Sequence, residues 1–528
     1  MINYSGVTHK PAGAPPCRKA THAPRPWLQP SRILSALLSF TLAGCVVGPD
    51  YRAPQLQILQ SFKNQAALET AGPRSSAPPL DSWWTGFRDP ELVRIIERVL
   101  AQNLDLAASQ ARIQQAQAVA QGAGARQMPQ GSVDAGVTRQ HQSLESPLGK
   151  IASSFPGYRR DQTLEIFGAA ASWELDLAGG LKRRTEAARD SAQVAEAMQT
   201  GLRISVAAEA ADAYFRVRGA KERIDLIESQ VKTVASQVEL VGKRVAYGVS
   251  DKREMAHSEA RLAQVRSRLA PLHTELEVQM NRLEVLMGAT PGTYQSELQG
   301  VQTQYVIPGI NTGAGPGELL RRRPDVIAAE RRLAVSNALI GLAISEYYPK
   351  VSLSALLGFE SLRSAAMFTP ASFQPAAVAG LHWRLFDFGL VDAEVAQAKG
   401  AKEEALANYR QAMLRATEDV ENAITVFVQI GVQKYELENE TKARGKACAA
   451  AQDEFKAGAV DLLEVLDEDQ KLSVAAEELA SAHANEARAA VAVFRAFGGG
   501  WTPMETGLRP RERTLPDGLH VHSGPKPR

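Results

Sequence analysis

Apolar positions follow two different periods along the first half of the chain. Helical spacing predicts a helix over residues 91–127, which Pro129 ends. Apolar residues then alternate with polar ones from Val133 to Thr138, which predicts a strand, and residues 162–177 predict a second one. Residues 181–246 contain no proline and predict a single helix, which at 1.5 Å per residue would be roughly 100 Å long.

The second half repeats this order. We expect a helix over residues 324–348, a strand over 351–360, a hairpin loop over 362–374, a fourth strand that includes Leu381, Trp383 and Leu385, and a helix of about 65 residues that reaches Phe455. The last helix is expected to end at Phe497. Three pairs of residues are each separated by 210 positions: Trp173 and Trp383, Gly179 and Gly389, and Gly248 and Gly458. The pattern therefore predicts a duplicated architecture.

Each long helix is followed by the same turn signal. Gly458 can end a helix in the left-handed conformation, and Asp461 can cap the next helix, with Glu464 as its capping-box partner. Gly248, Asp251 and Glu254 have the same spacing. Each half is thus predicted to contain a long helical hairpin, and residues 251–288 form the returning helix of the first one.

The N-terminus has the pattern of a targeting segment. Residues 1–44 combine basic residues with a short apolar run over 33–42, and Leu42-Ala43-Gly44-Cys45 resembles a bacterial lipobox, which makes Cys45 the lipidation site. The alternative is a plain cleaved signal peptide with an incidental cysteine. We expect an irregular segment over 45–90, a first repeat over 91–300, a second repeat over 301–501 and a disordered tail over 502–528.

The four predicted strands suggest a membrane-spanning sheet. No apolar run after residue 45 is long enough for a transmembrane helix, whereas alternating strands of about ten residues can cross a bilayer. A sheet in lipid must close into a barrel, and four strands are too few, so several chains would have to share one barrel. The alternative is a soluble four-stranded sheet with a coiled-coil stalk.

Composition and motifs do not favour catalysis. The net charge of +2 does not suggest a nucleic-acid partner, and three scattered cysteines do not form a disulfide or zinc framework. We find no phosphate-binding loop, no catalytic constellation and no clustered metal ligands; Met255 and His257 are isolated. We therefore expect no enzyme activity, no cofactor and no metal site.

Several short motifs, in their order and spacing, resemble the outer membrane factor family of TolC-like channels. The resemblance is to its lipoprotein branch of OprM and NodT-type proteins and covers residues 42–501. It is carried by Cys45-Val46-Val47-Gly48-Pro49-Asp50-Tyr51, Trp84 through Leu92, Trp173-Glu174-Leu175-Asp176, Arg322-Arg323-Pro324-Asp325-Val326, Leu385-Phe386-Asp387, the two glycine turns and Gly498-Gly499-Gly500-Trp501.

The resemblance implies an α+β membrane protein that forms a homotrimer. Four strands from each of three chains would give a 12-stranded β-barrel, continuous with a periplasmic α-helical barrel. It also implies a lipid-anchored position in the outer membrane, a periplasmic adaptor and an inner-membrane pump, usually of the resistance-nodulation-division type. The expected function is a passive efflux duct. A type I protein-secretion channel and a non-channel structural lipoprotein are the alternatives.

The resemblance further implies a gate at the periplasmic tips. By position, the apolar ring, the two acidic rings, the acid of the first hairpin and the aromatic gate residue are Leu463, Glu464, Asp467, Glu254 and Phe455. Some family members have an arginine at the position of Val460, so a salt-bridged lock of that kind is not expected. Without the resemblance, Glu464 and Asp467 would be read as a cap and a solvated helix face.

The exposed turns at the two tips are the expected adaptor-docking surface. Their residues are Gly248, Val249, Ser250, Gly458, Ala459 and Val460.

Overall fold

The computed structural model describes residues 46–54, 61–70, 76–300, 305–311 and 315–502. The predicted signal peptide, Cys45 and the tail from residue 503 lie outside these ranges. No helix among the described residues is long and apolar enough to cross a membrane.

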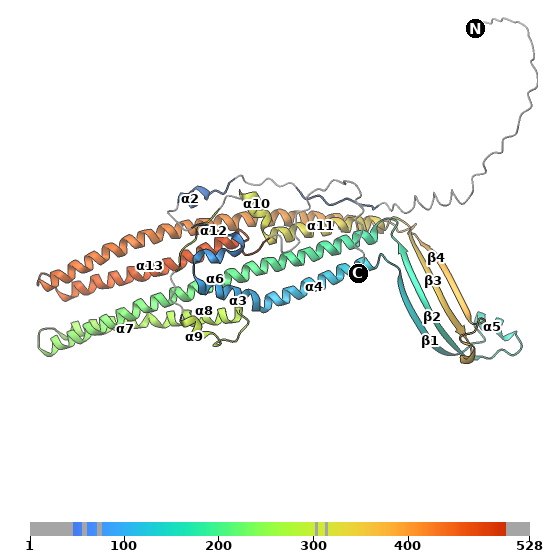
Figure 1. The fold of residues 1–528 in the computed structure, drawn as a ribbon, viewed down its shortest axis with the longest axis horizontal. Helices are drawn as coiled ribbons and strands as arrows, with labels where there is room; N and C mark the ends of the chain where they lie inside the picture. The colour runs from blue at the N-terminus through green and yellow to red at the C-terminus, as the bar shows by residue number, and fades with distance from the viewer. Residues whose placement is uncertain (1–45, 55–60, 71–75, 301–304, 312–314, 503–528) are drawn as a thin grey trace, which may run out of the picture. The chain divides into compact units, whose positions relative to one another are not determined.

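Two helices of equal length dominate the described chain (Figure 1). Helices α6 (Gly180–Ala246) and α12 (Leu390–Lys456) each contain 67 residues, which confirms the two long helices expected from the sequence. The return from α12 is α13 (Leu462–Ala496). The return from α6 is divided into α7 (Lys252–Ser267) and α8 (Leu269–Leu286), where a single helix was expected. Pro271 explains the division, because it has no N–H to bond the carbonyl of Ser267.

The predicted helix over residues 91–127 is also two helices. α3 (Pro90–Gln102) and α4 (Leu104–Ala125) are separated by Asn103, whose backbone is extended. The buried Asn103 side chain accepts a hydrogen bond from the N–H of Leu106 at 3.1 Å and donates one to the carbonyl of Leu286 at 3.0 Å. The break therefore caps α4 and ties it to the end of α8.

The four strands form one antiparallel sheet in the order β1-β2-β3-β4. Its strands are β1 (Gln130–His141), β2 (Asp161–Leu175), β3 (Lys350–Ser361) and β4 (Phe373–His382). Because β2 pairs with β3, the two repeats meet at the centre of the sheet. The fourth strand ends at His382, so Trp383 and Leu385 lie beyond it, contrary to expectation.

The two halves match in atomic detail at their strand–helix connections. The indole N–H of Trp173 donates to the carbonyl of Gln127, and that of Trp383 donates to the carbonyl of Tyr347, both at 2.9 Å. Each acceptor lies two residues before the proline that ends its helix. Such equivalent bonds support the duplicated architecture predicted from the sequence.

Aromatic packing fixes the short helix η1 (Leu80–Phe87) against the long helices. Trp83 stacks on Phe494 of α13 with ring centroids 5.5 Å apart, and Phe87 contacts Phe215 of α6 at 4.9 Å. The connector between the two repeats, residues 289–317, contains α9 and the start of α10. These and the remaining elements are α2 (Gln65–Thr70), η1 (Leu80–Phe87), α5 (Pro147–Ser153), α9 (Gln295–Gln299), α10 (Gly315–Arg322), α11 (Pro324–Ser345) and η2 (Ser364–Ala366).

Candidate gate at the helical tips

The turn that ends each long helix is built around a glycine. Gly248 and Gly458 have φ angles of +72° and +75°, which favour glycine, and a Cβ atom at either would meet nothing within 4 Å. The N–H of Val249 donates to the carbonyl of Arg244, and that of Ala459 donates to the carbonyl of Glu454, both at 2.9 Å. These are the six-to-one bonds of Schellman caps, so the sequence predicted both turns correctly.

An aspartate starts each returning helix. The carboxylate of Asp251 accepts from the N–H of Glu254 at 2.8 Å, and that of Asp461 accepts from the N–H of Glu464 at 3.0 Å. The predicted N-caps are therefore confirmed. The Glu254 carboxylate accepts a hydrogen bond from the Ser250 hydroxyl.

The first two turns of α13 have two distinct faces. Leu462 and Leu466 are buried against Val241 of α6, which joins the two hairpins of the chain. Leu463 lies on the other side and is 64% exposed, and Glu464 and Asp467 are exposed with it. The structure thus brings together three predicted gate residues on one surface of α13.

The other two predicted gate residues lie on different helices. Glu254 belongs to α7, at the tip of the first hairpin, and Phe455 belongs to the last turn of α12, where it is 38% exposed. Glu254 has a cation partner in its own hairpin, because a guanidinium nitrogen of Arg244 lies 3.8 Å from its carboxylate. Asp467 pairs with Lys471 one turn along α13, at 2.6 Å.

The sequence reading missed a set of ion pairs between the two hairpins. The guanidinium of Arg223 on α6 lies 2.8 Å from the carboxylate of Glu477 on α13, and Arg268 pairs with the same carboxylate. Arg261 of α7 lies 3.9 Å from Asp469 of α13. Charged residues are frequent along these helices, so no local signal distinguished these five residues from solvent-exposed neighbours.

Burial shifts the pKa values of the pair formed by Arg261 and Asp469. It lowers the pKa of Arg261 and raises the pKa of Asp469, and in each case the attraction of the opposite charge acts against the effect of burial. The pair is therefore held in a partly dry contact between the hairpins.

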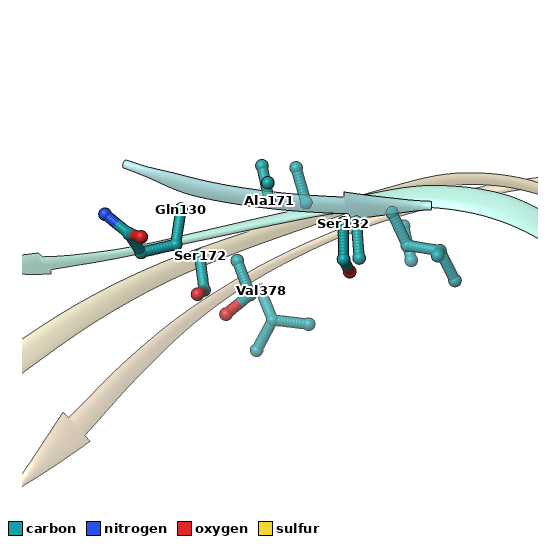
Figure 2. A pocket seen from close by; sticks show the side chains of 11 residues that line it. Gln130, Ser132, Ala171, Ser172 and Val378 are labelled. Carbon is teal, nitrogen blue, oxygen red and sulfur yellow. The ribbon is translucent and has the colours of Figure 1, made fainter. Parts of the chain in front are cut away.

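The sheet also has two chemically different faces. In the register of the strands, Ser354 lies opposite Ser172, which lies opposite Gln130, and Asp134 and Thr138 of β1 share the face of Gln130. Figure 2 shows Gln130, Ser132, Ser172 and Val378 on one side of the sheet and Ala171 on the other. The first face is mainly polar, as a channel lumen requires.

The opposite face is apolar and has aromatic residues at both ends. Its exposed aliphatic side chains include Val133, Leu353, Leu357 and Leu381. One end carries Trp173, and the other carries an aromatic cluster in which Phe359 contacts Phe373 at 5.5 Å and Phe368 at 5.4 Å. An apolar band with aromatic residues at its borders suits a lipid-facing surface.

Comparisons with known proteins agree with this geometry. The sequence profile of the outer membrane efflux protein family matches residues 95–289 and 315–499, which together exceed half of the chain. The chain belongs to the outer membrane efflux protein family. Among its relatives is the pyoverdine export outer membrane protein OpmQ of Pseudomonas putida, 30% identical over 431 residues that cover 81% of this chain and 90% of OpmQ.

Other relatives extend this result. Nodulation protein T of Rhizobium leguminosarum bv. trifolii is 26% identical and covers 90% of this chain and 98% of its own length. The solved structure of the outer-membrane channel OprN superposes with a TM-score of 0.77 at 30% identity, covering 87% of this chain and 100% of OprN. The relatives are channel proteins, not enzymes.

Membership in this family sets the function and the assembly. This outer membrane efflux protein is the outer-membrane channel component of a tripartite efflux system, and it works with an adaptor and a pump. It is a homotrimer, in which the sheets of three subunits close one β-barrel and their helical hairpins form a helical barrel in the periplasm. Strands β1 and β4 are the two edges of each sheet, so β4 of one subunit pairs with β1 of the next.

Proposed function

We propose that Leu463, Glu464 and Asp467 of the three subunits form the periplasmic gate of this efflux channel. The supporting observation is that the tip of α13 has two faces. The face with Leu462 and Leu466 is buried within the chain, whereas Leu463, Glu464 and Asp467 are exposed. Three-fold symmetry would gather like charges at one constriction, which favours cations over anions. The apolar Leu463 would narrow the opening.

Glu254 and Phe455 would complete this gate from the neighbouring helices. The gate has no arginine at Val460, but Arg244 supplies the charge beside Glu254. The pairs of Arg223 and Arg268 with Glu477, and of Arg261 with Asp469, would hold the second hairpin against the first. The pair of Arg261 with Asp469 lies nearest the tip, so separating the hairpins there would break this contact first.

The two exposed turns would be the adaptor-docking surface. Its residues are Gly248, Val249, Ser250, Gly458, Ala459 and Val460. The open space around both glycines leaves the turns accessible to a second protein. The pump would be of the resistance-nodulation-division type, and the channel itself would act as a passive duct without catalysis or a bound cofactor.

Cys45 would carry the lipid that anchors the chain to the outer membrane. The lipobox of residues 42–45 supports this, after removal of a signal peptide over residues 1–44. The segment over 45–90, which was expected to be irregular but contains α2 and η1, would then precede the two repeats over 91–300 and 301–501.

Single-channel recording tests the gate. The double substitution Glu464→Ala and Asp467→Ala should raise the conductance of the trimer in a planar bilayer and weaken its cation selectivity, because the constriction loses six carboxylates (two from each of three subunits).

A matched control removes a carboxylate from the same tip but from a different helix. Asp453 is an exposed carboxylate in the last turns of α12, and Asp453→Ala should leave both quantities unchanged. If the double variant conducts and selects like the unmodified channel, Glu464 and Asp467 do not line the constriction.

A further inference from the structure

The N-terminal residues 46–51, here called the strap, are bonded to helices from both repeats. The N–H of Val47 donates to the carbonyl of Ala178, just before α6, at 3.0 Å. The side-chain amide of the buried Asn337, on α11, donates to the carbonyl of Pro49 at 2.8 Å. The strap therefore lies against both α6 and α11.

A buried arginine of α6 directs most of its hydrogen bonds to the strap. The side chain of Arg183 is only 3% exposed. It donates to the carbonyls of Val47 at 3.1 Å and Gly48 at 3.2 Å, and its guanidinium pairs with Asp50 at 2.9 Å. Its acceptor outside the strap is Glu186, at 2.8 Å. Without the strap, a buried cation would lose three acceptors, which is costly.

Glycines allow the strap to lie this close. Gly48 has a φ of +88°, and a Cβ atom there would lie 2.4 Å from the Cα of Gly341 on α11. A Cβ atom at Gly341 would lie 2.8 Å from Nε of Arg183, and one at Gly179 would lie 2.8 Å from the Cα of Val46. Side chains at these three positions would displace the strap or the arginine.

Tyr51 extends the contact along α11. Its hydroxyl donates to the carboxylate of Glu330 at 3.3 Å, and its ring packs beside an apolar cluster that includes Leu333 and Tyr409. The guanidinium of Arg331 lies 6.0 Å from the ring centroid. Burial raises the pKa of Tyr51 well above its usual range.

We infer that the strap, held by the hydrogen bonds of Arg183, fixes the lipid-anchored end of the chain where the two repeats meet. We call this arrangement the clasp. α6 follows β2 and α11 precedes β3, and these two strands pair with each other. Since Val46 directly follows Cys45, a lipid on Cys45 is tethered one residue from the place where the repeats meet. This inference rests on the proposed lipid anchoring through Cys45. The contacts of residues 46–51 with Ala178, α6 and α11 do not depend on that lipid.

Arg183 is a positioning residue in this clasp, and disulfide cross-linking measures whether it holds the strap. We would combine Val47→Cys with Ala178→Cys in the full chain, with Cys448→Ser to remove the buried free thiol, and follow cross-linking in outer-membrane trimers. Adding Arg183→Met should reduce the cross-linked fraction at least about fivefold, because the strap loses its buried donor. The adjacent, exposed Arg184 is the matched control, and Arg184→Met should leave the fraction unchanged.

A second variant keeps the test valid if Arg183→Met does not assemble. Asp50→Asn removes only the charge of an exposed acceptor, and it should lower the cross-linked fraction about twofold or more. Equal cross-linking in the assembled Arg183→Met trimer, or in Asp50→Asn where that trimer is absent, overturns the clasp.

Labelling with radioactive palmitate tests the anchor separately. An unlabelled chain whose cross-link still depends on Arg183 refutes lipidation and leaves the clasp standing. A labelled chain whose cross-link is independent of Arg183 supports lipidation and refutes the clasp.

Discussion

The two ends of helix α6 use glycine for different reasons. Gly179, before its first residue, and Gly248, after its last turn, have nearly equal φ angles of +77° and +72°. A Cβ atom at Gly179 would lie 2.8 Å from the backbone of Val46, whereas one at Gly248 would meet nothing within 4 Å. The first glycine is needed for both conformation and space, and the second for conformation alone.

Charged residues differ between the same two regions. At the start of α6, Arg183 is buried and directs most of its hydrogen bonds to the strap. At the tip of α13, Glu464 and Asp467 are exposed, and Asp467 pairs with Lys471 on the same helix. The buried charge at the start of α6 is thus bonded to a distant part of the chain, whereas the exposed charges at the tip of α13 have at most a partner on their own helix.

Gly179→Val should have the largest effect. Overpacking costs about 1–3 kcal/mol, and a β-branched residue at positive φ adds about 1–3 kcal/mol of strain. We expect the amount of heat-stable trimer in outer membranes, measured by gel electrophoresis, to fall at least about tenfold. Gly248→Val carries only the strain and should keep most of the trimer; equal loss in both variants would contradict the distinction between the two ends.

Gly458→Val should leave the trimer in the membrane but abolish efflux. Its strain of about 1–3 kcal/mol is confined to an exposed turn, and the altered turn should no longer fit the adaptor. Drug susceptibility, trimer abundance and co-purification of the adaptor measure the three effects. The matched control is Gly157→Val, which has a φ of +86° and equally open surroundings between β1 and β2. Normal efflux by Gly458→Val would remove this turn from the docking surface.

Asp469→Asn should have the smallest effect, on the pH dependence of the tip. Because burial raises the pKa of Asp469, the folded tip binds a proton more readily than the unfolded chain. The stability of the tip should therefore fall as pH rises from the ordinary aspartate pKa through the raised one. Within that interval, the equilibrium constant for opening should increase by up to about tenfold for each pH step of one.

Hydrogen exchange of α7 and α13, corrected for intrinsic rates, measures this equilibrium. In Asp469→Asn the pH-dependent component should disappear, whereas Asp453→Asn, at an exposed position, should retain it. An unchanged pH profile in Asp469→Asn would show that Asp469 does not titrate with opening.

The sequence predicted elements well where local signals were strong. The glycine turns, the aspartate caps and both long helices follow from φ preferences and from contacts within a few residues. It failed at two helix breaks. Asn103 breaks a helix partly because its side chain reaches a distant partner, Leu286. Pro271 is a local signal, but it stands inside helical spacing that by itself predicts one helix.

By itself, then, the sequence determined the repeated order of helices and strands, the position of both tips and the family resemblance. The tertiary structure decided which charges are exposed at the tip and which are paired between hairpins, such as Glu464 and Glu477 on the same helix. It also decided that Arg183 meets Asp50, 133 positions away in the chain. Periodicity and capping act over neighbouring residues, whereas these pairs exist only after distant helices have packed together.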